Sequence, residues 1–229
     1  VHILSDVNVR LNRLRRMKSE MNYSAFGVTR MANNVLALDI ETKNLSHEIG
    51  GWGNTHMFLV STVATWDGNV CKVYVDEEVT SQISKSGYEA YPLRQLKYDL
   101  DDHFEKGGLL LGHNIVSFDL PVLRDSMDIF CIGKYMREKQ YIDTSRELTK
   151  QCGERLRLQN LVDHTLGESK SLQSHEAPGL WKAGEYNTVV DYCIKDTKLV
   201  YDLWKSGQKK PLKAFSIEKE KLIELEVKW

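Results

Sequence analysis

Residues 36–42 read LALDIET, and this short stretch sets the fold class and the chemistry to be expected. Its apolar run is typical of a buried strand. Asp39 and Glu41 stand two positions apart at the end of that run, and both leave the same face because side chains alternate along a strand. A buried carboxylate must be paired, protonated or bound to a metal. No Arg or Lys lies within three residues before Asp39 and only Lys43 follows, so the pattern favours a metal.

Two later segments carry acids that suit the same site. Residues 112–123, GHNIVSFDLPVL, place Asp119 at the start of a predicted helix. Residues 192–196, YCIKD, place Tyr192 and Asp196 four positions apart, which stacks them on one face of a helix. Any one of these acids by itself is more simply a solvated charge. Together, the segments predict a shared cluster of carboxylates.

The pattern of residues 187–205 predicts a helix that holds Tyr192 and Asp196 against the core. At roughly 100° per residue, both side chains fall at the border of an apolar stripe rather than on the charged face. A polar group at that border is expected to be kept from bulk water. The stripe consists of Val189, Val190, Cys193, Ile194, Thr197, Val200 and Trp204.

The three segments resemble the exonuclease motifs of the DnaQ-like 3′→5′ exonucleases, in the subclass whose third motif is Tyr-x-x-x-Asp. DIE, HN-x-x-x-FD and Y-x-x-x-D follow one another in that order within residues 35–205. A lone D-x-E carries almost no information, whereas three ordered motifs are specific. The resemblance implies an α/β protein of the RNase H-like fold, with a central mixed β-sheet flanked by helices.

Two branches of this family are similar to parts of the chain. Residues 156–170 and 179–197 resemble RNase H-like domains that occur alone or beside helicases. Residues 105–123, followed by YIDT at 141–144, resemble the proofreading domains of phage family-A polymerases. No polymerase follows, so a free-standing or helicase-associated exonuclease is expected, with a helicase or a replication or repair protein as a possible partner.

The resemblance implies a two-metal mechanism. Asp39, Glu41, Asp119 and Asp196 would hold two divalent cations, with Asp39 bridging them. Oxygen ligands suit Mg²⁺ or Mn²⁺ rather than zinc. One ion would activate a water and the other would stabilise the leaving 3′ oxygen. Tyr192 would position that water, since a phenol with a pKa near ~10 is a poor base at neutral pH.

Other residues are candidates for binding substrate. Asn114 and Phe118 match family positions near the terminal nucleotides, although Phe118 could equally pack in the core. His113 is expected to support the second motif rather than to act as a general base. Trp52 lies in a glycine-rich loop and would either wedge against a base or fold onto the sheet edge. Asp143, in YIDT, is expected to support the site rather than to ligate metal.

The substrate expected from the resemblance is the 3′ end of single-stranded DNA. RNA-trimming exonucleases of the same subclass remain an alternative, because the four carboxylates do not read a 2′-hydroxyl. In a second alternative the fold serves only as a nucleic-acid-binding or docking module. Loss of a metal ligand would mark that case, and no ligand is missing from the motifs.

Length and composition are those of one globular domain with extensions. The chain has 229 residues, of which 41% are hydrophobic, enough for one core. We expect a basic helical extension at residues 1–30, the exonuclease domain at residues 31–206, and a linker and C-terminal strand at residues 207–229. The net charge of −1 argues against a protein that coats duplex DNA. The basic extension would either bind a nucleic-acid backbone or pack on the domain.

Cysteine usage and hydropathy bear on location. The four cysteines form no C-x-x-C pair, so neither a zinc site nor a disulfide framework is predicted, and a reducing cytoplasmic setting is expected. No signal peptide or membrane-spanning run is found, so no membrane partner is expected. The first residue is Val1, so a trimmed start is expected.

The remaining elements follow from periodicity and turn residues. A hairpin is predicted from residues 56–66 and 70–75 around the Asp67-Gly68-Asn69 turn. Short strands are predicted at residues 109–112 and 141–144. Residues 209–213, KKPLK, are expected to be a linker, and residues 222–229 a single added strand that pairs with the sheet edge or another subunit. Helices are predicted at residues 92–106, 119–126, 145–151, 158–166 and 187–204.

Overall fold

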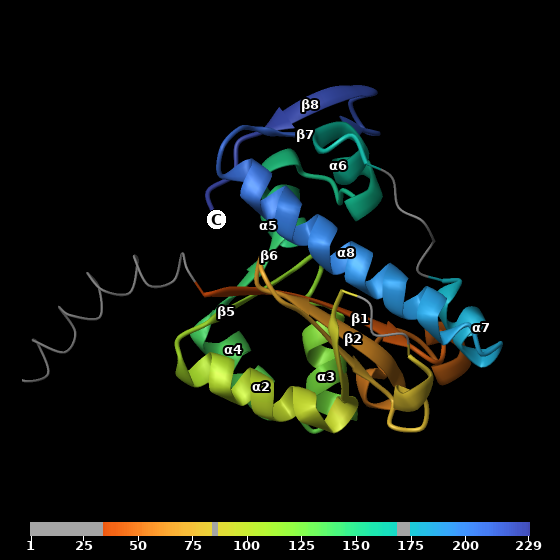
Figure 1. Cartoon of the computed structure of the whole chain (residues 1–229). Coiled ribbons are helices and arrows are strands. Elements are labelled where there is room, and N and C mark those ends of the chain that lie inside the picture. The colour runs from red at the N-terminus through yellow and green to blue at the C-terminus, as the bar shows by residue number, and fades with distance from the viewer. Residues whose placement is uncertain (1–33, 84–86, 169–174) are drawn as a thin grey trace, which may run out of the picture.

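A mixed six-stranded β-sheet forms the centre of the protein (Figure 1). The computed structural model describes residues 34–83, 87–168 and 175–229. The strand order is β4-β3-β2-β1-β5-β6, and β1 pairs antiparallel with β2 and parallel with β5. The strands are β1 (Val35–Thr42), β2 (Val60–Trp66), β3 (Cys71–Val75), β4 (Glu89–Pro92), β5 (Leu109–Gly112) and β6 (Tyr141–Asp143).

Helices cover both faces of this sheet (Figure 1). One face packs against α2 (Leu93–Glu105), α3 (Asp119–Ser126) and α4 (Cys131–Glu138). The other packs against α5 (Thr144–Cys152), α6 (Leu158–Thr165) and α8 (Tyr186–Gly207), and α7 (Ala177–Lys182) lies beside the start of α8. The predicted α/β fold with a mixed central sheet flanked by helices is confirmed.

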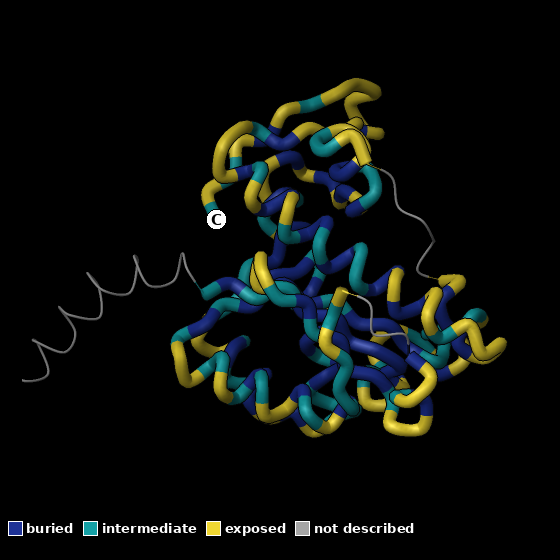
Figure 2. Tube along the Cα trace, viewed as in Figure 1, coloured by how far each residue is buried: buried dark blue, intermediate teal, exposed yellow. Residues whose placement is uncertain are grey.

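The alternation of side chains in β1 divides the core in two. Leu38 and Ile40 pack with α2, α3 and α4, whereas Val35 and Ala37 pack with α8 on the opposite face. Both sets are buried, as the dark interior of Figure 2 shows. Asp39 and Glu41 continue the series of Val35 and Ala37, so the pleat of β1 directs both acids toward α8.

The long helix α8 follows the predicted pattern. Its apolar stripe is buried from Val189 to Trp204. Tyr192 is 1% exposed and Asp196 is 4% exposed, which confirms that both are held against the core. The predicted hairpin is also confirmed: β2 and β3 are antiparallel, and the Asp67 carboxylate accepts hydrogen bonds from two backbone amides of the turn.

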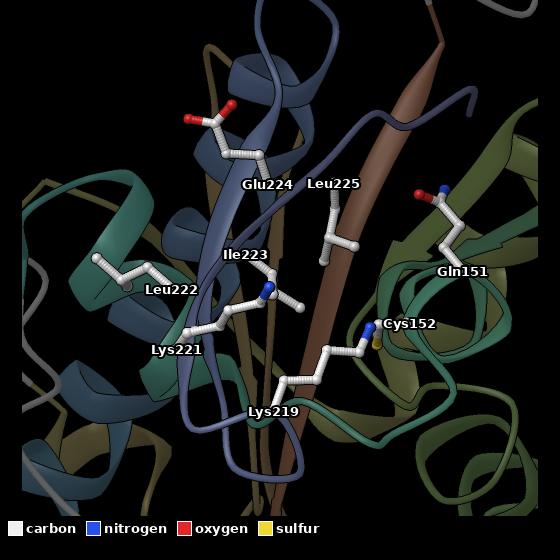
Figure 3. Close-up of a pocket in the computed structure, with 8 residues that line it drawn as sticks. All are labelled: Gln151, Cys152, Lys219, Lys221, Leu222, Ile223, Glu224 and Leu225. Atoms are coloured by element: carbon white, nitrogen blue, oxygen red, sulfur yellow. The ribbon is translucent and has the colours of Figure 1, made fainter.

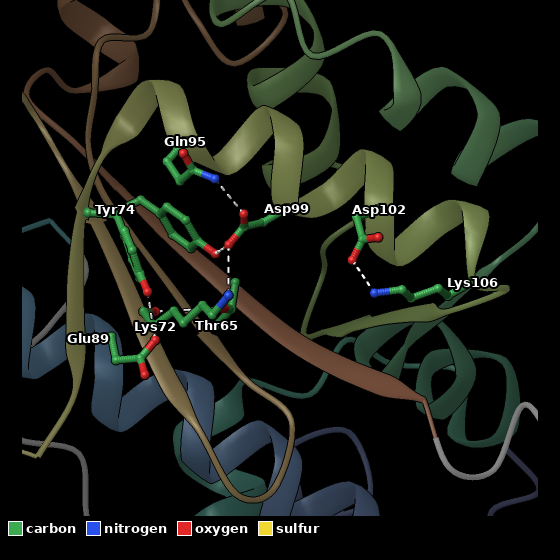
Figure 4. Close-up of polar contacts among 9 residues, drawn as sticks. Thr65, Lys72, Tyr74, Glu89, Gln95, Asp99, Asp102 and Lys106 are labelled. Atoms are coloured by element: carbon green, nitrogen blue, oxygen red, sulfur yellow. Dashed lines mark hydrogen bonds and ion pairs between the residues drawn. The ribbon is translucent and has the colours of Figure 1, made fainter.

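A polar network ties α2 to β3 of the sheet (Figure 4). The Asp99 carboxylate accepts hydrogen bonds from Lys72 at 2.9 Å and from the Tyr74 hydroxyl at 2.7 Å. The Gln95 amide, one turn earlier on α2, donates to its other oxygen at 2.8 Å. Asp99 is therefore a partly buried acid whose two carboxylate oxygens both accept hydrogen bonds that stabilise the fold.

The C-terminal segment departs from the prediction of a linker followed by one strand. Two strands, β7 (Leu212–Ser216) and β8 (Lys221–Leu225), form a separate antiparallel hairpin and join no edge of the central sheet. The prediction was wrong because LKAFS also alternates, burying Leu212, Ala214 and Ser216. The free edge of β7 is satisfied by α6, where the Asn160 amide bonds both backbone groups of Phe215.

A cavity of about 530 Å³ lies between β8 and the end of α5 (Figure 3). Gln151 and Cys152 line one side and residues 221–225 line the other. Within the described part of the chain, no helix combines the length and apolar character needed to cross a membrane. The predicted basic extension at residues 1–30 lies outside the described residues. The elements β4, α4 and α7 were not predicted from the sequence.

Candidate active site

The first two acids occupy the end of β1 beneath α8. Asp39 is half-buried and lies opposite Ala64 of β2, while Glu41 is 7% exposed and lies opposite Thr62. The register between β1 and β2 shifts directly after Glu41, so that Thr42, the last residue of β1, pairs with Val60. Lys43, the nearest cation in the sequence, forms an ion pair with Asp76. Lys43 therefore pairs with an acid that is not part of the motifs.

Asp119 reaches the same end of β1 from the next parallel strand. Because β1 and β5 are parallel, their carboxyl ends meet at one edge of the sheet. The loop after β5 leads into α3, which begins at Asp119 as predicted. The Asp119 carboxylate accepts a hydrogen bond from the backbone of Ile40, the residue between Asp39 and Glu41. This bond brings the second motif against the first.

Asp143 fixes the loop of the second motif. Its carboxylate accepts hydrogen bonds from the backbone amides of Asn114 at 2.9 Å and Val116 at 3.1 Å. It also caps α5 by accepting from the Arg146 amide at 3.1 Å. Asn114 needs this restraint because it has a left-handed backbone, with φ of 69°. These contacts agree with the prediction that Asp143 supports the site rather than ligating metal.

His113 links three segments around the same loop. Its Nδ1 lies 2.9 Å from the Thr144 hydroxyl at the start of α5. Its Nε2 donates to the Leu156 carbonyl at 3.1 Å. Both ring nitrogens therefore have protein partners, which favours the predicted role in supporting the second motif over that of a general base.

The third motif lies on α8, which packs against β1. The Cys193 thiol, between Tyr192 and Asp196 on α8, lies 3.4 Å from the backbone carbonyl oxygen of Asp39. Burial raises the pKa of this thiol well above its usual value. The negative charges of Asp39, Glu41 and Asp196 raise that pKa further. Three acids from two motifs therefore lie close enough to one thiol to act on it electrostatically.

Burial shapes the electrostatics of Asp119. Desolvation raises the pKa of Asp119 to about 7, and the neighbouring charge of Asp143 acts in the same direction. Hydrogen bonds from the backbone of Asp119 and Ile40 oppose the shift without cancelling it. A carboxyl group in this state releases its proton readily when a cation is placed beside it.

An aromatic cluster borders the acids. The Phe118 ring, at the start of α3, lies edge-on to Trp52 at 5.4 Å and to Phe58 at 5.2 Å between ring centroids. Phe58 is buried, Phe118 is half-buried, and Trp52 is 67% exposed. Trp52 therefore lies outside the core but packs against Phe118. The exposure of the three rings increases from Phe58 through Phe118 to Trp52. The exposed end of the cluster is suited to stacking on a base.

The donor types present suit hard divalent cations. Asp39, Glu41, Asp119 and Asp196 offer carboxylate oxygens only, which Mg²⁺ and Mn²⁺ prefer. As the side chains stand, no group of three or more His, Cys, Asp or Glu residues in the described ranges is arranged to enclose an ion. Binding would require these carboxylates to draw closer together. The fit therefore lies in the chemistry of the donors and in their shared end of the sheet.

No protein-family model matches this sequence, and no curated protein matches it either. The resemblance to an exonuclease family therefore rests on the three motifs and on the fold that carries them.

The structure adds residues that the sequence patterns did not indicate. Thr62 faces the site opposite Glu41, and its buried hydroxyl has no hydrogen-bond partner within the described ranges. Arg146 and Arg155 line a cavity beside Asn114. The sequence does show several cations at residues 146–157. That they lie beside the loop of the second motif can be seen only in the structure. For Thr62 there was no signal.

Proposed function

We propose that this protein is a metal-dependent 3′→5′ exonuclease that acts on single-stranded DNA, with a DnaQ-like active site in an RNase H-like fold. The observation that carries the proposal is that acids from three separate motifs lie near one end of β1, although among the described residues they do not yet enclose an ion. Asp119 bonds the backbone between Asp39 and Glu41, and Asp196 acts on the same thiol as those two acids. The mixed sheet with helices on both faces supports the same fold.

In this proposal the four acids of the motifs hold the catalytic cations. Divalent cations held by these acids would supply positive charge to the attacking and the leaving oxygen of an in-line displacement. Asp39 and Glu41 come from a rigid central strand and Asp196 from a long packed helix. Elements of this kind hold ligands with less movement than loops do.

The protein's own residues position the strand and the water. Tyr192, one turn before Asp196, orients the attacking water through its hydroxyl. Asn114 bonds the sugar or phosphate of the terminal nucleotide, and the Phe118 and Trp52 rings stack on its base. The leaving 3′ oxygen takes its proton from a water molecule.

DNA is favoured over RNA by the HN-x-x-x-FD form of the second motif. The carboxylates themselves contact phosphate and cannot distinguish the sugars, so an exoribonuclease of the same subclass is the second candidate. A helicase or a replication or repair protein would supply the single-stranded end.

End-labelled substrates test the proposal. Single-stranded DNA, RNA of the same sequence, 3′-recessed duplex and circular single-stranded DNA are each incubated with Mg²⁺, Mn²⁺ or EDTA. We expect mononucleotides released from the 3′ end of linear DNA with either metal, and no products in EDTA. A terminal 3′-phosphate or a closed circle should resist.

Three outcomes contradict parts of the proposal. Cutting of the circle points to an endonuclease. Faster release from RNA moves the substrate to the second candidate. Binding of single strands with no hydrolysis in either metal indicates a binding module.

A further inference from the structure

A polar cavity of about 500 Å³ opens beside the loop of the second motif. Two parts of the chain besides that loop form its walls, namely the outer side of α5 and the loop that follows α5. The lining includes Asn114, Ser117, Arg146, Thr149, Lys150 and Arg155. The cavity therefore presents amide, hydroxyl and cationic groups together.

The cavity lies next to the candidate active site. Asp143 lines it and, with the same carboxylate, accepts a hydrogen bond from the Asn114 amide at 2.9 Å. The charge of Asp143 also acts on Asp119, so the two acids are neighbours. A strand with its end at Asp119 would have to pass this cavity or leave on the opposite side.

The exposed charged groups that line the cavity are cations, whereas its one acid, Asp143, is buried. Lys150 is paired with Glu147 at 2.6 Å. Arg146 and Arg155 are exposed, and neither forms an ion pair with any other described residue. The Asp143 charge is met by three backbone amides rather than by an arginine. Two guanidinium groups therefore remain available to an anion.

We propose that this cavity binds the backbone phosphates of a single strand, at nucleotides on the 5′ side of the one being removed. The inference rests on the proposed function, since it takes the cleaved end to lie at the acids. Guanidinium groups bind phosphate oxygens in a bidentate manner, and hydroxyl and amide groups add further donors. The two available cations reach the cavity from different segments, Arg146 from α5 and Arg155 from the loop that follows it. Two separate cations suit successive phosphates of a strand better than one free anion.

The C-terminal hairpin holds Arg155 in place. Glu154, the preceding residue, accepts hydrogen bonds from the Ser216 hydroxyl and from the Ile217 amide at 3.2 Å. On the other side of Arg155, the Leu156 carbonyl accepts from His113 at 3.1 Å. The loop that presents Arg155 is therefore fastened to the hairpin and to the second motif. Such fixing lowers the entropy lost on binding.

Binding without turnover tests the inference. Fluorescence anisotropy in EDTA measures the affinity of fluorescein-labelled oligothymidylates of about 12 and about 3 nucleotides, lengths chosen to exceed and to fall short of the cavity's reach. The proteins are wild type, Arg146→Gln, Arg155→Gln and the double variant. Arg137→Gln is the matched control, because Arg137 is an exposed arginine of α4 on the other face of the sheet. Inorganic phosphate serves as a competitor, and circular dichroism checks each fold.

We expect each arginine variant to bind the long oligonucleotide about 5- to 20-fold more weakly, and the double variant more weakly still. The slope of log K against log salt should fall by about 0.7 for each phosphate that the variant no longer neutralises. The weakening should be smaller for the short oligonucleotide, and Arg137→Gln should match wild type. In Mg²⁺, the KM for the long substrate should rise in the same order.

Unchanged affinity and salt slope in the double variant would overturn the inference, as would wild type that fails to bind the long strand in EDTA. Equal weakening for both lengths, together with competition by millimolar phosphate, would show a site for a single free anion instead. The proposed function fails separately. Arginine-dependent binding without hydrolysis would leave the phosphate site standing and remove the exonuclease, whereas hydrolysis that needs Asp39 but neither arginine would do the reverse.

Discussion

The molecule places acids against the same sheet in two different ways. At the corner between α2 and β3, burial raises the pKa of Asp99, but hydrogen bonds from Gln95, Tyr74 and Lys72 outweigh it and hold that pKa below its usual value. At the end of β1, burial dominates, and the pKa of Asp119 rises to about 7. The charge of the first acid holds the fold together. The second acid destabilises the fold when ionised, as expected for an acid that a bound cation would stabilise.

This contrast predicts opposite responses to neutralisation, and the largest concerns activity. Asp39→Asn or Asp196→Asn should lower the hydrolysis rate by about 1,000-fold or more, on the order of 4 kcal/mol in the barrier, because each removes a charged cation ligand. Asp99→Asn should retain the wild-type rate. The measurement is release of labelled mononucleotides in Mg²⁺, with thermal melts to confirm the folds.

Turnover above a few per cent of wild type in either ligand variant would remove that residue from the metal site. Their melting temperatures in EDTA should equal or exceed that of wild type, since each change removes one of several neighbouring like charges. If these variants instead melt at lower temperatures than wild type, Asp39 and Asp196 stabilise the fold as Asp99 does.

The next effect is on stability as a function of pH without metal. The folded protein keeps the Asp119 proton up to about pH 7, whereas the unfolded chain loses it near the ordinary pKa of 3.8. The free energy of unfolding should therefore fall by a few kcal/mol as pH rises from about 4 to 7, because the unfolded state binds fewer protons. Asp119→Asn should abolish this decline.

Melting curves in EDTA across that pH range measure the effect. Saturating Mg²⁺ should reduce the decline in wild-type stability as pH approaches 7, because a cation that binds the ionised carboxyl of the folded state stabilises that state. Parallel curves for wild type and Asp119→Asn would mean that Asp119 is not held protonated.

The acids and the elements that carry them could be predicted from the sequence, for physical reasons. Because β1 and α8 are long and periodic, periodicity alone assigned Asp39, Asp196 and Tyr192 to faces of those elements. The strand β4 is an edge of four residues, too short for a pattern, and the first two residues of β7, Leu212 and Lys213, were assigned to a linker. The cavity beside Asn114 could not be predicted from the sequence. The loop that carries Arg155 is held by contacts such as that of Glu154 with Ser216, which lie 62 residues apart.

Tyr192 tests the division of labour within the acid site. Tyr192→Phe should slow hydrolysis by about 10- to 100-fold, since one hydrogen bond to the nucleophile is worth roughly 1.5–3 kcal/mol. The rate should still rise with pH as the attacking water ionises. A loss as complete as that of Asp196→Asn, with no remaining pH dependence, would show that the phenol takes the proton itself.

The smallest effect is expected at the corner between α2 and β3. Asp99→Asn keeps an acceptor for the Tyr74 hydroxyl but removes the charge that attracts Lys72, so unfolding should become easier by about 1 kcal/mol. Because the pKa of Asp99 is lowered in the folded state, its contribution is present above the unfolded pKa near ~4 and is lost as pH falls through the folded pKa. Urea titrations should therefore show the gap between wild type and Asp99→Asn at pH 7 and its narrowing below pH ~4. A gap that stays constant in acid would mean that packing rather than charge makes Asp99 stabilising, and the contrast with Asp119 would then rest on activity alone.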